Sequence, residues 1–205
     1  ITEFVKKGGN FVTTYFSGIV NENDLCFLGG FPGPLREVTG IWAEEIDTLD
    51  YGEYNEVDVL GKSYKAVDYC ELIHTQTAKT LGNYATDFYK GMSAVTENCY
   101  GDGKAYFIAF RDEGDFVCDF YKDIASKMNL ERAIEVDLPT GVTARARYDT
   151  TYKYVFVQNF NNNEVKVNLA GICATDMETG ENAENELCLS NYGIKILKIK
   201  LSYSK

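Results

Sequence analysis

His74 is the only histidine in this chain of 205 residues, and a serine or cysteine nucleophile would need it as its general base. It stands at the end of a predicted apolar strand, and no nucleophile motif lies near it in the sequence. The sequence therefore favours a structural histidine at a strand end. A cysteine–histidine pair made with Cys26 or Cys70 stays open as the alternative.

Carboxylates occur in two clusters, and neither has the arrangement of a catalytic acid and base. Glu44 and Glu45 are neighbours in a predicted strand, where successive side chains point to opposite faces. Asp112, Glu113 and Asp115 open a predicted helix, where acids complement the positive end of the helix dipole. The glycine-rich turns lack the strand–helix context of a phosphate-binding loop. We therefore predict no catalytic residue and no cofactor in this chain.

Six cysteines are scattered along the chain without a CxxC pair or the ligand spacing of a zinc site. Two of them, Cys70 and Cys118, lie inside apolar segments, where a free thiol behaves as a small hydrophobic group. No N-x-[ST] glycosylation site is present. We expect buried free thiols, no bound metal, and a reducing compartment, which points to the cytoplasm.

The composition favours folded domains and argues against two classes of partner. Acidic residues outnumber basic ones by 31 to 20, and the net charge is −11. Since no cluster of lysine and arginine offsets this charge, nucleic acid and anionic membranes are poor partners. No apolar run approaches the ~20 residues of a membrane-spanning helix. With 45% hydrophobic and 14% aromatic residues, the chain can form real cores.

The elements at the start of the chain suggest a mostly parallel sheet. Residues 1–7 have helical spacing, and Gly8-Gly9 follows as a helix stop. Residues 10–16 are mostly β-branched and aromatic, which predicts a buried strand. A helix, a tight glycine turn and a buried strand form the αβ unit of such a sheet. Because a seven-residue helix is marginal alone, we also expect the chain to begin inside a helix and inside a domain.

The following segments predict further strands and two helices. Pro34 suits the first position of a short helix that Gly40 ends. Hairpins are expected at Gly61-Lys62 and at residues 101–103. From Phe116 to Met128, apolar residues recur with the period of a helix that covers a sheet. The expected strands of this region are residues 41–46, 57–60, 63–67, 69–74, 79–84, 94–98 and 105–110.

After Asn129 the sequence alternates between apolar and polar residues, as in antiparallel strands with one buried face. Residues 142–146 and 165–169 show this alternation, and longer strands are expected at 152–160 and 194–201. In the last strand the apolar phase slips between Ile196 and Leu197, which predicts a bulge. Together these segments predict a small β-sandwich.

Several segments resemble the glycoside hydrolase family 42 β-galactosidases, namely residues 8–24, 28–41, 94–106 and 191–194. The resemblance runs through nearly the whole chain. It implies a domain of α/β class, with a mixed sheet and a partial flavodoxin- or glutamine-amidotransferase-like fold, at residues 1–131. This domain, incomplete at its start, forms a homotrimer in the family. A small antiparallel β-sandwich domain is expected at 132–205.

The resemblance implies that this chain helps to assemble the trimer and has no catalytic role. Family members hydrolyse terminal β-D-galactosides with retention, using two glutamates of a (β/α)₈ barrel, and no part of this chain corresponds to that barrel. No catalytic residue is carried over, and we expect the chain itself to be inactive. Its expected partners are the catalytic barrel and the sister subunits. The candidate contacts are the segments Ser17–Asp24 and Phe31–Arg36, and within them Ser17, Asp24, Phe31 and Arg36.

Two other functions remain as alternatives. A carbohydrate-binding module could use exposed aromatic residues, Trp42 and some of the 15 tyrosines, to stack on sugars. A stand-alone enzyme of amidotransferase type would need His74 as its base.

Overall fold

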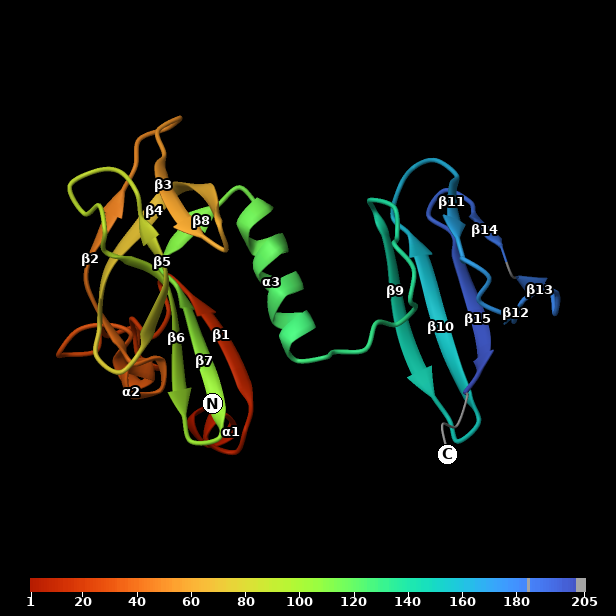
Figure 1. Ribbon diagram of the computed structural model, residues 1–205, viewed down its shortest axis with the longest axis horizontal. Coiled ribbons are helices and arrows are strands. Elements are labelled where there is room, and N and C mark those ends of the chain that lie inside the picture. The colour runs from red at the N-terminus through yellow and green to blue at the C-terminus, as the bar shows by residue number, and fades with distance from the viewer. Residues whose placement is uncertain (184, 202–205) are drawn as a thin grey trace. The chain divides into compact units, whose positions relative to one another are not determined.

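The computed structural model describes residues 1–183 and 185–201. Contacts within the chain divide it into two compact units, Ile1–Met128 and Asn129–Lys205. Strands are the main elements of both units (Figure 1). Each unit has a hydrophobic core of its own.

The first unit is built on an 8-stranded sheet, and helices pack against it. Its strands are β1 (Asn10–Thr14), β2 (Ile41–Thr48), β3 (Asn55–Val59), β4 (Lys62–Thr75), β5 (Lys79–Tyr84), β6 (Ser93–Tyr100), β7 (Gly103–Ile108) and β8 (Phe110–Asp112). Its helices are α1 (Thr2–Lys6), the 3-10 turn η1 (Gly33–Leu35), α2 (Arg36–Thr39) and α3 (Asp115–Lys127).

The sheet of the first unit curls and closes on itself. Its strand order is β1-β7-β6-β5-β3-β4-β2, β8 pairs with β4, and β4 also pairs with β6 through Ile73 and Ser93. Strands β3, β4, β6 and β5 therefore form a closed barrel. β1 runs parallel to β7, whereas the other strand pairs of this unit are antiparallel.

The expected α/β domain with a flavodoxin- or amidotransferase-like fold is wrong. The chain is 46% strand and 12% helix, and its first sheet closes as a barrel. The physical reason lies in the connections. Tight turns join β3 to β4 and β6 to β7, and such turns produce antiparallel pairs. Helices α1 and α2 have 5 and 4 residues, too few to carry the crossover between parallel strands.

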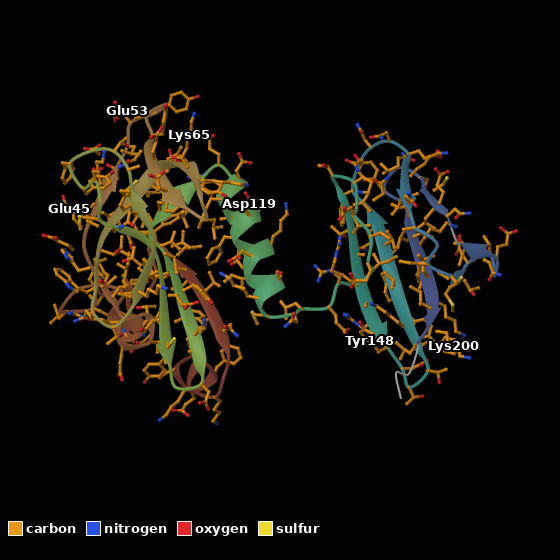
Figure 2. The ribbon with its side chains drawn as sticks, viewed as in Figure 1. Glu45, Glu53, Lys65, Asp119, Tyr148 and Lys200 are labelled. Carbon is orange, nitrogen blue, oxygen red and sulfur yellow. The ribbon has the colours of Figure 1, made fainter. Side chains whose placement is uncertain are left out.

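The predicted long helix is confirmed as α3. Its buried residues Phe116, Phe120 and Ile124 belong to the main core of the first unit. Beside this buried stripe, Asp119 (labelled in Figure 2) accepts hydrogen bonds from Lys62 Nζ at 2.7 Å and Tyr64 Oη at 2.9 Å, which tie the helix to β4. Of the three acids predicted to cap this helix, Asp112 does so, since its carboxylate accepts the N–H groups of three residues at the start of the helix.

Other local predictions hold with small shifts. Gly40 ends α2 with φ of 67°, in the left-handed region that glycine adopts easily. The first hairpin turns at Leu60 and Gly61, one residue earlier than expected. Residues 63–67 and 69–74 belong to one strand, β4, which is distorted at Asp68 with φ of 58°. Its pairing with β8 shifts register at the same place.

The second unit consists of antiparallel strands. Their bounds are β9 (Val142–Tyr148), β10 (Tyr152–Asn159), β11 (Val165–Asn168), β12 (Ala174–Asp176), β13 (Asn182–Ala183), β14 (Glu186–Leu189) and β15 (Ile194–Lys200). A larger sheet has the order β13-β12-β15-β10-β9, and β11 pairs with β14. One core joins the two sheets, with Val155 and Leu197 from the larger and Val167 and Leu187 from the smaller.

The predicted bulge in the last strand is wrong. β15 pairs with β10 without a register shift, from Lys200 opposite Tyr152 to Ile194 opposite Gln158. Leu197 is fully buried, whereas Ile196 lies on the outer face and is half-buried. The apolar phase slips because this strand has apolar residues on both faces.

All six cysteines are free, but the prediction that they are buried holds for Cys70 alone. Cys118 lies on α3 outside its buried stripe and is exposed. Apolar neighbours in the sequence did not predict the burial of Cys118 correctly, because one side of the helix faces solvent.

Candidate functional site

The two segments expected to make contacts lie together in the structure. A side chain at Gly18 would collide with the backbone carbonyl of Pro32, and one at Gly33 would meet the Gly18 carbonyl and the Phe27 ring. These glycines have φ of 63° and 48°, a conformation that favours glycine. The connection between β1 and β2 therefore folds back on itself at a glycine junction.

Ser17 is fixed at the start of this connection. Thr13 Oγ1 donates to Ser17 Oγ at 2.6 Å, and the N–H of Phe16 donates to Glu71 Oε1 at 2.8 Å. Asp24 is exposed and lies in the turn between Val20 and Cys26, which form an isolated bridge. That turn is held by Asn21, whose Oδ1 accepts two backbone N–H groups.

Glu71 is a component of the site that the sequence reasoning missed. Its residue is 2% exposed, and burial raises the pKa of its carboxyl to about 7, although the bond from Phe16 opposes the shift. A charged residue inside the apolar run of a predicted strand was a signal that could have revealed it. Because β4 supplies Glu71, the barrel holds the first residue of the connection through one carboxylate.

Arg36 is fixed at the other end of the connection. Its Nε donates to Gln76 Oε1 at 2.9 Å, and its Nη1 donates to the carbonyl of Gly29 at 3.0 Å. The guanidinium carbon lies 5.9 Å from the centre of the Trp42 ring. A planar cation with two fixed hydrogen bonds loses little side-chain freedom when a partner binds.

Trp42 and His74 form a stacked pair beside Arg36. They are cross-strand partners in β2 and β4, with ring centres 4.5 Å apart and an interplanar angle of 14°. Glu44 Oε2 lies 2.6 Å from His74 Nε2. His74 is therefore a structural strand-end residue that supports Trp42, as expected. One face of the Trp42 ring is covered by this stack.

Phe31 contributes to the core as well as to the surface. It is half-buried, and its carbonyl accepts the N–H of Ala43 at 2.9 Å. Its ring packs against the small cluster that includes Ile41 and Phe107.

Exposed apolar side chains add the strongest interface signal. Phe16, Val20, Leu25 and Leu28 are 45%, 44%, 64% and 99% exposed, and all four belong to the connection between β1 and β2. Apolar residues that gather on one exposed segment mark a contact surface more clearly than single ones do. We call this surface, formed by residues 16–36 with Trp42, the connection surface.

The geometry does not support a catalytic pair of Cys70 with His74. Cys70 and His74 lie four residues apart on one strand, about 13 Å along it. Burial raises the pKa of the Cys70 thiol to about 11, the opposite of what a nucleophile needs. His74 is engaged with Glu44. Among the described residues no group of three or more His, Cys, Asp or Glu could hold a metal ion.

Comparison of the chain with known protein families identifies the family to which it belongs. The family described as "Beta-galactosidase trimerisation domain" matches residues 1–131, and "Beta-galactosidase C-terminal domain" matches residues 141–198. The chain belongs to the glycoside hydrolase family 42 β-galactosidases, of which it contains the trimerisation and C-terminal parts and not the catalytic barrel.

Two relatives illustrate the extent of the match. The chain is 50% identical over 207 residues to β-galactosidase Pbg of Clostridium perfringens, covering 98% of this chain and 30% of Pbg. It is 40% identical to β-galactosidase BgaA of a Planococcus species, covering 96% and 30%. The chain thus spans about 30% of the length of these curated relatives.

Solved structures agree with the sequence match. The β-galactosidase of Rahnella sp. R3 superposes with a TM-score of 0.85 and 45% identity, covering 98% of this chain and 30% of that one. Gan42B, a GH42 β-galactosidase from G. stearothermophilus, gives a TM-score of 0.86 and 38% identity, covering 98% and 29%. Among the described residues, no helix is long and apolar enough to cross a membrane.

Proposed function

We propose that this chain is the assembly part of a trimeric β-galactosidase, and that its connection surface contacts a sister subunit. The observation that carries the proposal is the meeting of the segments Ser17–Asp24 and Phe31–Arg36 at the Gly18–Pro32 junction. Exposed leucines and a fixed arginine beside a tryptophan lie on the same connection. Arginine and large apolar residues are typical of interface centres.

Sedimentation velocity of the chain tests this proposal. We expect the wild-type chain to sediment as a trimer and Arg36→Ala to dissociate about 30-fold more readily, as for a central interface arginine. Leu28→Ala should act in the same direction without harm to the fold, because that side chain is 99% exposed. Phe31→Ala should also weaken the trimer, but its ring is part of a core cluster, so its melting temperature must be measured as well.

Arg145→Ala is the matched control, since Arg145 is an exposed arginine of the second unit. It should leave the trimer intact. A monomeric wild-type chain, or variants that all sediment like the wild type, would contradict the proposal.

For the whole protein we propose hydrolysis of terminal β-D-galactosides with retention, which rests on the names of the relatives and on the family resemblance. The catalytic groups would then belong to a barrel outside this chain. A chromogenic β-galactoside should be hydrolysed by the enzyme with its barrel and not by residues 1–205 alone. We also propose a cytoplasmic location, which the six free cysteines support.

A further inference from the structure

The outer face of the larger sheet in the second unit carries aromatic and basic side chains. In β10, Val155 and Val157 are fully buried in the core. The alternate residues, Tyr154 and Phe156, face outward and are half-buried. In the described part of the second unit, no helix is available to cover this face.

The strand register aligns five polar side chains across this face. Tyr154 lies opposite Arg147 of β9 on one side and Lys198 of β15 on the other. Lys198 lies opposite Thr175 of β12, which in turn lies opposite Asn182 of β13. Directly paired residues share a face of the sheet. A single row across five strands therefore presents a cation, a phenol, a second cation, a hydroxyl and an amide.

A shallow depression of about 430 Å³ lies at the end of this row. It is lined by Tyr152, Cys173, Ala174, Thr175, Asn182, Lys198 and Lys200. Lys198 Nζ lies over the Tyr152 ring, 4.0 Å from its centre, so the ring helps to position the ammonium group in the lining of the depression. Lys200 lies at the same end of the sheet as Tyr148 (Figure 2). The volume is in the range of ~300–1,000 Å³ that small-molecule sites occupy.

The electrostatics of this face differ from those of the chain as a whole. Arg147, Lys198 and Lys200 make no ion pair with any described residue, although the net charge of the chain is −11. Asp149 is the acid that accompanies them. It is occupied by the N–H groups of two neighbours and by the hydroxyl of Tyr154 at 2.8 Å. Arg145 lies on the same face, opposite Phe156, so the cations outnumber Asp149 and leave the face positive.

We propose that this depression binds an anionic sugar, a uronic acid unit of an oligosaccharide. The carboxylate pairs with Lys198 and Lys200, the ring carbons pack against the exposed part of Tyr152, and the hydroxyls bond to Thr175 and Asn182. A pyranose ring with several hydroxyls and one carboxylate uses all of these groups at once. An acidic peptide would use the two cations and leave the hydroxyl and the amide without matched partners.

Titration of the ¹⁵N-labelled chain with trigalacturonate tests the site. We expect saturable shifts of the amide signals of Thr175, Asn182 and Lys198, with a Kd near or below about 1 mM and weakening as salt rises. Lys198→Ala and Tyr152→Ala should each weaken binding by about 10-fold, the usual loss for one charged hydrogen bond or one packed ring. Lys166→Ala, which removes a cation from the other sheet, is the matched control and should bind as the wild type does.

Two further ligands decide which chemistry the site recognises. Neutral galactotriose has the rings without the charge, and tri-aspartate has the charge without the rings. Both should bind at least about 10-fold more weakly than trigalacturonate. Equal binding of either one, no shifts at about 10 mM trigalacturonate, or unchanged binding by Lys198→Ala would overturn the proposal.

Discussion

Each unit contains a carboxylate that accepts hydrogen bonds from backbone N–H groups, one bond at Glu71 and two at Asp149. The pKa values of the two carboxylates are shifted in opposite directions. In the first unit, burial raises the pKa of Glu71 to about 7, and one N–H group, from Phe16, opposes that shift. In the second unit the pKa of Asp149 is lowered by the N–H groups of Thr151 and Tyr152 and by the Tyr154 hydroxyl. Asp149 is exposed. The comparison shows that one hydrogen bond does not offset desolvation, whereas several bonds at the surface dominate.

This difference gives the two units opposite responses to pH. The folded-state pKa of Glu71 is above its ordinary value of 4.5. Its contribution to the free energy of unfolding is therefore fully present below pH 4.5 and is lost as pH rises through about 7. The folded-state pKa of Asp149 is below its ordinary value of 3.8. Its contribution is therefore present above that value and is lost as pH falls through the lowered pKa.

The largest expected effect tests whether the stability of the first unit can change alone. Phe120→Ala removes a ring that is 1% exposed in the main core and should cost about 3–5 kcal/mol of unfolding free energy. Hydrogen exchange should show faster opening of β4 and β7 while β10 and β15 keep their protection. The control is Tyr121→Ala, because Tyr121 is 49% exposed on the same helix. Equal loss of protection in both units would show that they unfold together.

The next effect tests the buried carboxylate directly. Glu71→Gln keeps an acceptor for the Phe16 N–H and removes the charge, so it should stabilise the first unit above pH 7 by up to about 3 kcal/mol. Near pH 4.5 the two proteins should unfold alike, since the carboxyl is then neutral in the folded state. Thermal unfolding at several pH values measures the difference. Glu53→Gln, at an exposed glutamate of the same unit, should show no such dependence. A gain that is the same at all pH values would contradict the assignment.

The smallest effect concerns the second unit. Asp149→Asn should lower the melting temperature of that unit at neutral pH, because an amide accepts the same hydrogen bonds more weakly than a carboxylate does. The difference between the wild type and the variant should shrink as pH falls below 3.8 and through the lowered pKa of Asp149. Asp137→Asn, at a fully exposed side chain, serves as the control. A variant as stable as the wild type at pH 7 would show that these bonds add nothing measurable.

Local patterns were enough to predict many elements of this fold. The apolar stripe of α3 and the stop at Gly40 depend on residues close in sequence, and both were predicted correctly. The fold class of the first unit was not, because it depends on pairings between distant strands. β1 lies beside β7, about 90 residues later, and nothing near Asn10 signals that partner. A helix, a glycine turn and a strand are shared by α/β domains and by this barrel.

The candidate contact residues were chosen from loop position and resemblance, and their contacts remain a prediction. The structure adds what only register and packing can supply. The stack of Trp42 on His74 needs the exact pairing of β2 with β4, and the row through Tyr154 and Lys198 needs four aligned strand pairs. The alternation of Tyr152, Tyr154 and Phe156 was visible in the sequence, but the cations beside them lie in other strands.

Trp42 gives the chain a natural optical reporter. It is the sole tryptophan, and its ring lies against His74 and near Arg36, at the edge of the connection surface. Excitation of indole alone therefore observes that surface without a label. Subunit association there should shift the emission, so one fluorescence trace can follow assembly in the same sample that is used for sedimentation.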